Sequence, residues 1–248
     1  MQIKLLQWNI LFKEDIENIV KTIQEINPDI VSLQELTIKA KYNPTIPNTP
    51  EHIAKMLDYE YYFQVAHRWE NDPELAAIGN GIFTRFPIEK SSFSQVREEP
   101  MANIAGSDEG RVYVESVIKV GEKSLTVGNV HLSFTDHFEE DGAKKKETDS
   151  LIEIIKQKQK DFIFSGDLNS IPDSYTINQV NKYLVNCGPS FDQHTWTTRP
   201  LTEPTFGEGR LAWRLDYIFA TKDVRVQDAS ILEVEYSDHL PILATFTV

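Results

Sequence analysis

Near the middle of the chain, a carboxylate and an amide stand two positions apart at the end of a short apolar run. The run, 162–164, leads through Gly166 to Asp167 and Asn169. A short run of β-forming residues predicts a buried strand, and glycine lets the backbone turn tightly or approach a ligand closely. Residues two apart on an extended segment point to the same side, so the pair suits oxygen and metal chemistry. An Asx turn that closes the strand is an equally good interpretation.

Polar side chains that can donate, accept or bind a metal also follow the other predicted strands, namely Asn9, Glu35, His131, Asp216, and Asp238 with His239. A single polar residue after a strand is more often solvated than functional. Six strand ends that all carry Asn, Asp, Glu or His favour a shared site. Hard oxygen ligands of this kind suit Mg²⁺ or Mn²⁺. The sequence contains neither a Cys/His cluster of the zinc type nor a Walker-type phosphate loop.

The composition is that of a globular, acidic protein. Of the 248 residues, 40% are hydrophobic and 25% are charged, which is enough to build a sizeable core. A net charge of −13 argues against a wide duplex-tracking surface, although it leaves room for a local basic groove. The one cysteine, Cys187, allows no internal disulfide. The first residues are too polar for a signal peptide, and no stretch approaches the ~20 apolar residues of a membrane span. We therefore expect a soluble, cytoplasmic protein without a membrane anchor.

The elements before Glu35 indicate how its carboxylate meets Asn9. A strand predicted over 3–8 ends at Asn9, and a second strand over 29–35 ends at Glu35. Between them, apolar residues recur at helical spacing from 16 to 26, and Asn27 followed by a proline ends the helix. Two strands that flank one helix would bring Asn9 and Glu35 to the same edge of a sheet.

The rest of the chain alternates between short strands and polar loops. We predict helices at 51–57, 143–160 and 175–184, and strands at 59–66, 79–85, 111–120, 123–133, 214–220, 224–234 and 240–248. Loops are predicted at 37–50, 67–77, 96–110, 134–142 and 188–210. Because no internal repeat or linker divides the chain, we expect one α+β domain over residues 1–248. Many strands and few helices favour two packed sheets flanked by helices.

Six short motifs that contain the polar strand ends resemble the endonuclease/exonuclease/phosphatase superfamily, which includes exonuclease III and deoxyribonuclease I. In chain order they are Leu6-Gln-Trp-Asn-Ile10, Ser32-Leu-Gln-Glu-Leu36, Gly128-Asn-Val-His-Leu132, Ser165-Gly-Asp-Leu-Asn-Ser170, Arg214-Leu-Asp-Tyr-Ile218 and Tyr236-Ser-Asp-His-Leu-Pro241. The combination of Gly-Asp-Leu-Asn with Ser-Asp-His-Leu-Pro is specific to that superfamily. The resemblance implies a four-layer α/β sandwich of two mostly antiparallel sheets, which agrees with the prediction from the elements.

The same resemblance implies a hydrolase of phosphate esters that uses Mg²⁺ or Mn²⁺. Glu35 would be the main metal ligand, with Asn9 nearby and Asp238 as a further ligand or an orienting group. In such a reaction the protein mainly positions groups and stabilises charge, and the metal supplies much of that charge. The number of metal ions is not implied.

The resemblance also assigns roles to the remaining strand-end residues. Asp167 would position and deprotonate the attacking water, and Asn169 would fix its orientation. His239 would contact a phosphoryl oxygen while Asp216 orients its ring, an arrangement that favours the charged imidazole. His131 would add a second donor to the phosphate.

Several other residues have competing interpretations. The lysines at 144–146 predict a solvated helix face, with phosphate binding as the less favoured alternative. For Trp69, Trp196 and Trp213, packing is favoured over stacking on a substrate ring. Asn80, which lies between two glycines, could contact a substrate or form a turn.

The substrate class stays open at this stage. The chain has no basic extension, leucine-rich repeat or hydrophobic hairpin, and it is similar to compact bacterial members and to the tyrosyl-DNA phosphodiesterase branch. We expect a monomer that cleaves phosphodiester bonds of nucleic acid, as a nuclease or a DNA-end-processing phosphodiesterase. The alternative is a phosphatase or phosphodiesterase for a small-molecule or lipid phosphate ester, which the acidic charge keeps close behind. A non-catalytic binding module is a remote third, because the Asp/Asn pair and the final Asp-His are both intact.

Overall fold

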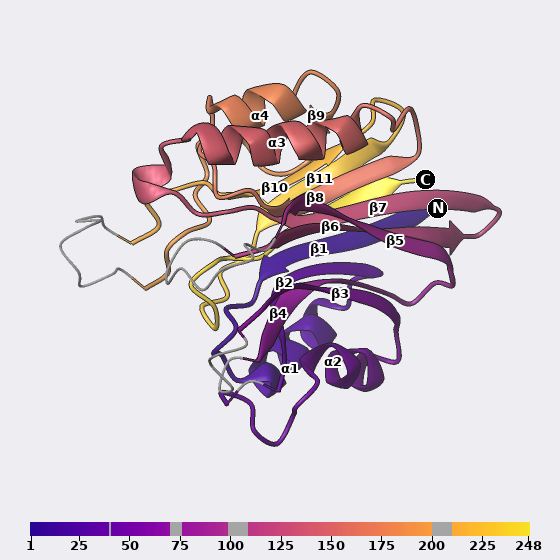
Figure 1. Cartoon of the computed structure of the whole chain (residues 1–248). Coiled ribbons are helices and arrows are strands. Elements are labelled where there is room, and N and C mark those ends of the chain that lie inside the picture. Colours follow the sequence, from indigo (N-terminus) through magenta and orange to yellow (C-terminus); the bar gives the residue numbers. More distant parts are fainter. Residues whose placement is uncertain (40, 70–75, 99–108, 200–209) are drawn as a thin grey trace.

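Two six-stranded β-sheets pack face to face, with helices on their outer faces (Figure 1). The structure is a computed structural model that describes residues 1–39, 41–69, 76–98, 109–199 and 210–248. The first sheet, sheet A, has the strand order β11-β12-β1-β2-β4-β3, and the second, sheet B, has the order β5-β6-β7-β8-β10-β9. Helices α1 and α2 lie outside sheet A, and α3 and α4 lie outside sheet B (Figure 1). The predicted four-layer α/β sandwich is confirmed.

The strands are β1 (Gln2–Asn9), β2 (Ile30–Ile38), β3 (Glu60–Arg68), β4 (Ala77–Thr84), β5 (Ile88–Arg97), β6 (Arg111–Val120), β7 (Lys123–His131), β8 (Phe162–Asp167), β9 (Val185–Asn186), β10 (Asp216–Ala220), β11 (Arg225–Ile231) and β12 (Ile242–Thr247). The helices are α1 (Ile16–Ile26), α2 (Thr49–Leu57), α3 (Gly142–Ile155) and α4 (Tyr175–Val180), with a short 3₁₀ turn, η1, at Asp136–Phe138. Parts of the loops predicted at 67–77, 96–110 and 188–210 lie outside the described residues.

Each sheet contains one parallel pair of neighbouring strands among otherwise antiparallel ones. In sheet A the pair is β1 and β2, and in sheet B it is β7 and β8. A parallel connection needs a crossover, which α1 supplies in sheet A and α3 in sheet B. Because the strands of a parallel pair end at the same edge, each sheet presents two strand ends side by side.

Helix α1 forms where the sequence predicts it. Asp15 caps its first turn by accepting a hydrogen bond from the backbone N–H of Glu17, and Asn27 ends it in the left-handed conformation. Its buried face repeats every three or four residues and consists of Ile16, Ile19, Val20, Thr22 and Ile23. This face packs on sheet A, against side chains of β1 and β2.

Helix α3 departs from the prediction in its extent and in its buried face. It ends at Ile155, whereas the charge pattern predicts a helix to residue 160. Its buried face has helical spacing but begins with polar residues, and it consists of Lys144, Glu147, Thr148, Leu151, Ile152 and Ile155. The apolar half packs on sheet B. The polar half faces the loops that follow β7 and β8, through bonds described below.

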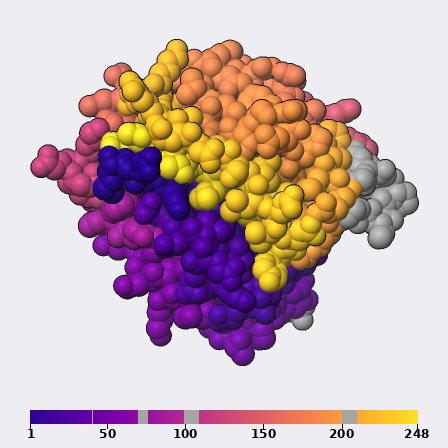
Figure 2. Space-filling model, turned by 180° about the vertical axis from the view of Figure 1, so that it is seen from behind, coloured from indigo at the N-terminus to yellow at the C-terminus, as the bar shows by residue number. Residues whose placement is uncertain are grey.

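Two strands of sheet B are missing from the sequence prediction. β5 is an edge strand whose sequence, IEKSSFSQVR, is mostly polar and largely solvent-facing, so its alternation is weak. β9 has only two residues and is held by pairing with β10. The two ends of the chain meet in sheet A, where the Met1 ammonium donates to the Val248 carbonyl. In Figure 2 the indigo N-terminal segment accordingly lies next to the yellow C-terminal segment. Among the described residues, no helix combines the length and apolar composition needed to cross a membrane.

Candidate functional site

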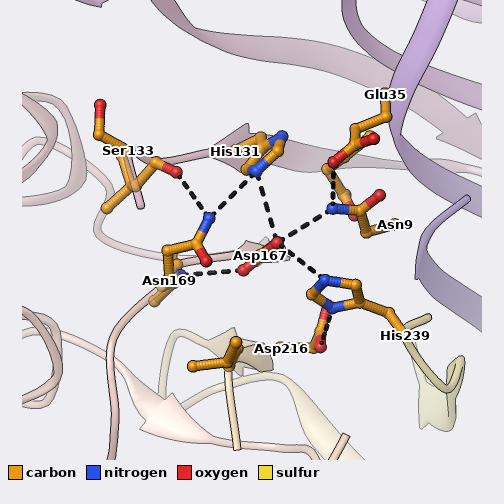
Figure 3. A network of polar contacts seen from close by, with 12 residues as sticks. Asn9, Glu35, His131, Ser133, Asp167, Asn169, Asp216 and His239 are labelled. Atoms are coloured by element: carbon orange, nitrogen blue, oxygen red, sulfur yellow. Dashed lines mark hydrogen bonds and ion pairs between the residues drawn. The ribbon is translucent and has the colours of Figure 1, made fainter. Parts of the chain in front are cut away.

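The two parallel pairs deliver four polar side chains to one edge of the sandwich (Figure 3). β1 ends at Asn9 and β7 ends at His131, while β8 ends at Asp167. Glu35 lies within β2, where the register against β4 shifts between Leu33 and Leu36. Its backbone is left-handed, with φ 63°, as expected of a residue at a β-bulge that re-aims a side chain. Asn9 and Glu35 therefore lie close together, as predicted, and Asp167 of sheet B lies beside them.

Asn9 links the carboxylates of the two sheets. Its Nδ2 atom lies 3.0 Å from Oε1 of Glu35 and 3.0 Å from Oδ2 of Asp167. Its Oδ1 atom accepts a hydrogen bond of 3.1 Å from the backbone N–H of Leu11, which fixes the amide orientation. Both amide hydrogens thus serve carboxylate oxygens, so Asn9 holds the carboxylates of Glu35 and Asp167 close together.

Asp167 is buried at the centre of the site. Its Oδ1 atom accepts from the backbone N–H of Asn169 at 2.9 Å, and its Oδ2 atom lies 3.4 Å from His131 Nε2 and 3.6 Å from His239 Nε2. Burial, partly offset by His239, raises the pKa of Asp167 to about 7. A carboxyl group with this pKa can exchange a proton near neutral pH, which is what a general base requires.

The backbone N–H of Asn169 donates to Asp167 Oδ1, so the Asx turn predicted for this stretch is present. Asn169 has a left-handed backbone, with φ 45°. Its side-chain Nδ2 donates 3.0 Å to the carbonyl of Leu132 and lies 3.1 Å from His131 Nε2. The turn therefore points the Asn169 amide at the end of β7.

His239 forms a carboxylate–imidazole pair with Asp216. His239 Nδ1 lies 2.8 Å from Asp216 Oδ2, and both side chains are buried. Burial alone would lower the pKa of His239, but Asp216, Asp167 and Asp238 outweigh it and hold this pKa well above 6.5. The ring is therefore charged at neutral pH, and its Nε2 edge faces Asp167.

His131 has the opposite protonation state. Burial, with added repulsion from Arg111, His239 and Lys144, puts its pKa well below 6.5. A neutral ring has one acceptor nitrogen, and the approach of the Asn169 amide assigns that role to Nε2. The site thus holds one charged and one neutral imidazole on either side of Asp167.

Glu35, Asp238 and Asn9 fit a divalent cation by the chemistry of their donor atoms. Burial and then the nearby charge of Asp238 raise the pKa of Glu35. The donors to these carboxylates are neutral groups, namely the Asn9 amide and Phe12 N–H for Glu35, and the Trp196 indole and Ser237 hydroxyl for Asp238. Two close carboxylates with neutral donors and hard oxygen atoms match what Mg²⁺ or Mn²⁺ binds.

A second grouping is a weaker candidate for a cation. One atom each of Asp167, Asp216 and His239 lie within 4.8 Å of one another. However, His239 Nδ1 already pairs with Asp216, and the ring carries a positive charge that repels a metal ion. The donor chemistry therefore favours the Glu35 side over this grouping as a place for a cation.

A chain of buried side-chain amides leads to Asp216, and the sequence did not predict it. Gln7 Nε2 donates to Asp216 Oδ1 at 3.1 Å and to Gln34 Oε1 at 2.9 Å. Gln34 then donates to Asn129, whose amide donates to the carbonyls of Leu33 and Gly81. The chain crosses from one sheet to the other and orients Asp216. Period-2 spacing from Asn9 back to Gln7 was the available signal.

Lys144 corrects the prediction of a solvated lysine face. Lys145 and Lys146 are exposed, but Lys144 is only 1% exposed. Its Nζ atom donates to the backbone carbonyls of Ser133 and Leu168, each at 2.6 Å. Sequence composition cannot separate these three lysines, whereas the spacing 144, 147, 148, 151 places the first of them on the buried helix face.

Asn80 lies apart from the site contacts. Its side chain is 2% exposed and donates to the Val112 carbonyl at 2.9 Å, which ties β4 to β6. This position supports a structural role and gives no support to the predicted substrate contact. Of the tryptophans, Trp196 and Trp213 pack around Phe138 beside His239, and Trp69 packs edge-on against His67.

Comparisons with known proteins bear on the family and the fold. The model of the endonuclease/exonuclease/phosphatase family matches residues 6–239, and none of the curated proteins matches the chain. A family protein from Beutenbergia cavernae is similar with a TM-score of 0.77 and 19% identity, covering 100% of this chain and 72% of that one. A mannosyl-6-phosphatase from Bacteroides thetaiotaomicron (TM-score 0.71, 16% identity, 99% and 100% covered) and TDP2 from D. rerio complexed with a single-strand DNA product (0.71, 16%, 100% and 99%) are also similar. At these sequence identities, the similarity to solved structures shows the fold alone.

Proposed function

Because the chain belongs to the endonuclease/exonuclease/phosphatase family, we propose that it hydrolyses phosphate esters with a divalent cation, and that phosphodiester bonds of nucleic acid are its main substrate. The observation that carries the proposal is the arrangement around Asp167. A buried carboxyl group with a pKa of about 7 faces a charged imidazole, His239, and a fixed amide, Asn169. This combination supplies a base and charge stabilisation within one cluster.

Asp167 is the proposed general base. Its Oδ2 atom takes a proton from the attacking water, while the hydrogen bonds from Asn9 and Asn169 hold the carboxylate in place. Because the pKa of about 7 lies near physiological pH, Asp167 is present in its basic form for part of the time and is still basic enough to accept the proton. A base positioned in this way typically contributes ~10²–10⁴-fold in rate.

His239, Asn169 and His131 are the proposed stabilisers of the phosphoryl group. His239 carries a positive charge that Asp216 maintains, so its Nε2–H can donate to a phosphoryl oxygen as negative charge develops. Asn169 offers its amide beside His131, whose neutral ring can donate once it turns or changes tautomer. These groups are preorganised by bonds to the backbone and to one another.

Glu35, with Asn9 and Asp238, would hold the cation. When bound, a divalent cation polarises a phosphoryl oxygen and neutralises part of its charge. Glu35 and Asp238 need that neutralisation themselves, since each lies in the field of the other. Trp196 fixes one oxygen of Asp238 by a bond of 3.0 Å and so limits the directions in which this carboxylate can point.

A phosphatase or phosphodiesterase for a small phosphate ester is the second candidate. The net charge of −13 favours it, because long nucleic acids are attracted by basic surfaces. The fold-level likeness to a mannosyl-6-phosphatase is as strong as that to TDP2, so similarity does not separate the two. A non-catalytic binding role stays the remote alternative.

The test is hydrolysis by the purified protein with Mg²⁺ or Mn²⁺. Substrates are bis-p-nitrophenyl phosphate, p-nitrophenyl phosphate, a plasmid, an abasic duplex, a 5′-phosphotyrosyl oligonucleotide and inositol phospholipids. Asp167→Asn and His239→Ala should each lower kcat by about 10²–10⁴-fold, while Asp228→Asn, an exposed acid on β11, should leave it unchanged. Equal, slow product release by wild type and both site variants would exclude catalysis. Much faster hydrolysis of monoesters than of diesters and DNA would exclude the nuclease.

A further inference from the structure

The polar start of helix α3 clamps the loop that follows β7. Ser133 stands two residues after His131, and all three of its polar groups are bonded. Its backbone N–H donates to Glu147 Oε1 at 2.8 Å, its carbonyl accepts from Lys144 Nζ at 2.6 Å, and its hydroxyl accepts from Arg97 at 3.0 Å. Lys144 and Glu147, about one helical turn apart, therefore bind the carbonyl and the N–H of Ser133, respectively.

Lys144 also reaches the loop that follows β8. Its ammonium group donates to the Leu168 carbonyl at 2.6 Å, and Leu168 stands between Asp167 and Asn169. The same ammonium thus joins the exits of β7 and β8, which carry His131 on one side and the Asp/Asn pair on the other. Two bonds also join these exits directly: the Asn169 amide donates to the Leu132 carbonyl, next to Ser133, and the Leu132 N–H donates to the Asp167 carbonyl.

A buried ammonium at this place carries a large desolvation cost, which lowers the pKa of Lys144 to about 8. The charged and titratable groups that face it are Glu147, Asp167, Glu140 and Arg111. An apolar residue of similar length could fill the space without that cost, but it could not satisfy two buried carbonyls. The charge and the donors are therefore what the position requires.

We propose that Lys144 is a positioning residue that sets the distance and orientation between His131 and the Asp167/Asn169 pair, with Glu147 as the partner that holds Ser133 from the other side. Lys144 touches neither the substrate nor the reacting atoms in this proposal. It acts through the Ser133 and Leu168 carbonyls, and its effect on rate rests on the proposed function. Its effect on the His131 ring does not.

The experiment compares Lys144→Met and Lys144→Arg with Lys146→Met, an exposed control on the same helix. Readouts are kcat and KM with bis-p-nitrophenyl phosphate, the urea midpoint, and the ring ¹⁵N shifts of His131 referenced to those of His52 and His194. Lys144→Met should lower kcat by about 10²-fold with little change in KM, because misplacement of the order of 1 Å costs that much. It should also shift the His131 ring signals toward a mixture of tautomers.

Lys144→Arg keeps a charge and several donors, so it should recover part of kcat and part of the His131 shift. A folded Lys144→Met protein with wild-type kcat and unchanged His131 signals would overturn the proposal. If Lys144→Met does not fold, Lys144→Gln decides, because its shorter side chain carries a neutral amide in place of the ammonium: unchanged His131 signals and kcat would overturn the proposal, and a changed ring signal with lower kcat and unchanged KM would support it. If wild type hydrolyses no substrate, the proposed function fails, while the ring shifts still test the positioning role.

Discussion

The side-chain amide of Asn9 lies 3.0 Å from Glu35 in its own sheet and 3.0 Å from Asp167 in the other sheet. It is the direct hydrogen-bonded link between the proposed cation ligand and the proposed base. Its two N–H groups favour the charged forms of both carboxylates, against the effect of burial. One neutral side chain thus lowers the pKa of two carboxyl groups.

Replacement of Asn9 should therefore change both rate and pH dependence. Asn9→Leu removes both donors and should lower kcat/KM by about 10²-fold, as loss of one preorganised donor does. Asn9→Asp keeps the shape but adds a carboxylate, so the pKa of Asp167 should rise and the acid limb of the pH–rate profile should move upward. The profile of each variant between pH 5 and 9 measures this. An acid limb unmoved in Asn9→Asp would show that Asp167 does not govern it.

Asp167 should make the metal-free protein less stable as the pH rises. Its folded pKa of about 7 lies above the value of ~3.9 expected in the unfolded chain. The folded state therefore binds the proton more tightly, and the resulting stability is fully present below pH ~4 and is lost as the pH rises through about 7. Urea midpoints at pH 5 and pH 8 in EDTA should fall more for wild type than for Asp167→Asn. Identical changes in both proteins would contradict the assignment.

Loss of Glu35 should have opposite effects with and without the cation. In EDTA, Glu35→Gln removes a desolvated charge beside Asp238, so the free energy of unfolding should rise or stay level. With Mg²⁺, wild type should gain about 2.7 kcal/mol at 100 times Kd, and Glu35→Gln should gain far less. Calorimetry with and without Mg²⁺ measures both. Glu25→Gln, which changes an exposed acid on α1, should follow wild type throughout. If Glu35→Gln gained as much unfolding free energy from Mg²⁺ as wild type, the cation would have to bind at another site.

Gly166 should tolerate no side chain. Its backbone has φ 155°, and a Cβ atom there would lie 2.1 Å from the Val130 carbonyl oxygen of the neighbouring strand. Because backbone cannot move aside as a side chain can, Gly166→Ala should cost about 3 kcal/mol of unfolding free energy and should displace Asp167. Gly121→Ala, in the open β6–β7 turn, meets no atom within 4 Å but has φ 63°, so it should cost only the smaller backbone strain. Chemical denaturation of both variants gives the comparison.

The sequence predicts the strand ends well because each one couples an apolar run to a polar residue at a fixed place. Asn9, His131 and Asp167 converge because parallel strands end at a common edge. Glu35 lies within β2 at a bulge, beyond which the strand continues to Ile38, and His239 precedes the antiparallel strand β12, so these two positions follow from other features. Lys144 is different, since its role depends on which side of α3 faces sheet B. Three consecutive lysines give no signal for which of them lies on the buried side. Asn80 fails for a similar reason, because its neighbour β6 comes from the other sheet and distant pairing leaves no local signal.

The position of β12 couples the assembly of sheet A to the contact between His239 and Asp216. β12 lies between β11 and β1 in sheet A, and its register runs along β1 from Gln2 to Gln7. His239 stands three residues before β12, yet its partner Asp216 sits in sheet B. Because His239 leads into β12, we expect that removal of β12 from sheet A would also break the His239–Asp216 pair, which joins the two sheets.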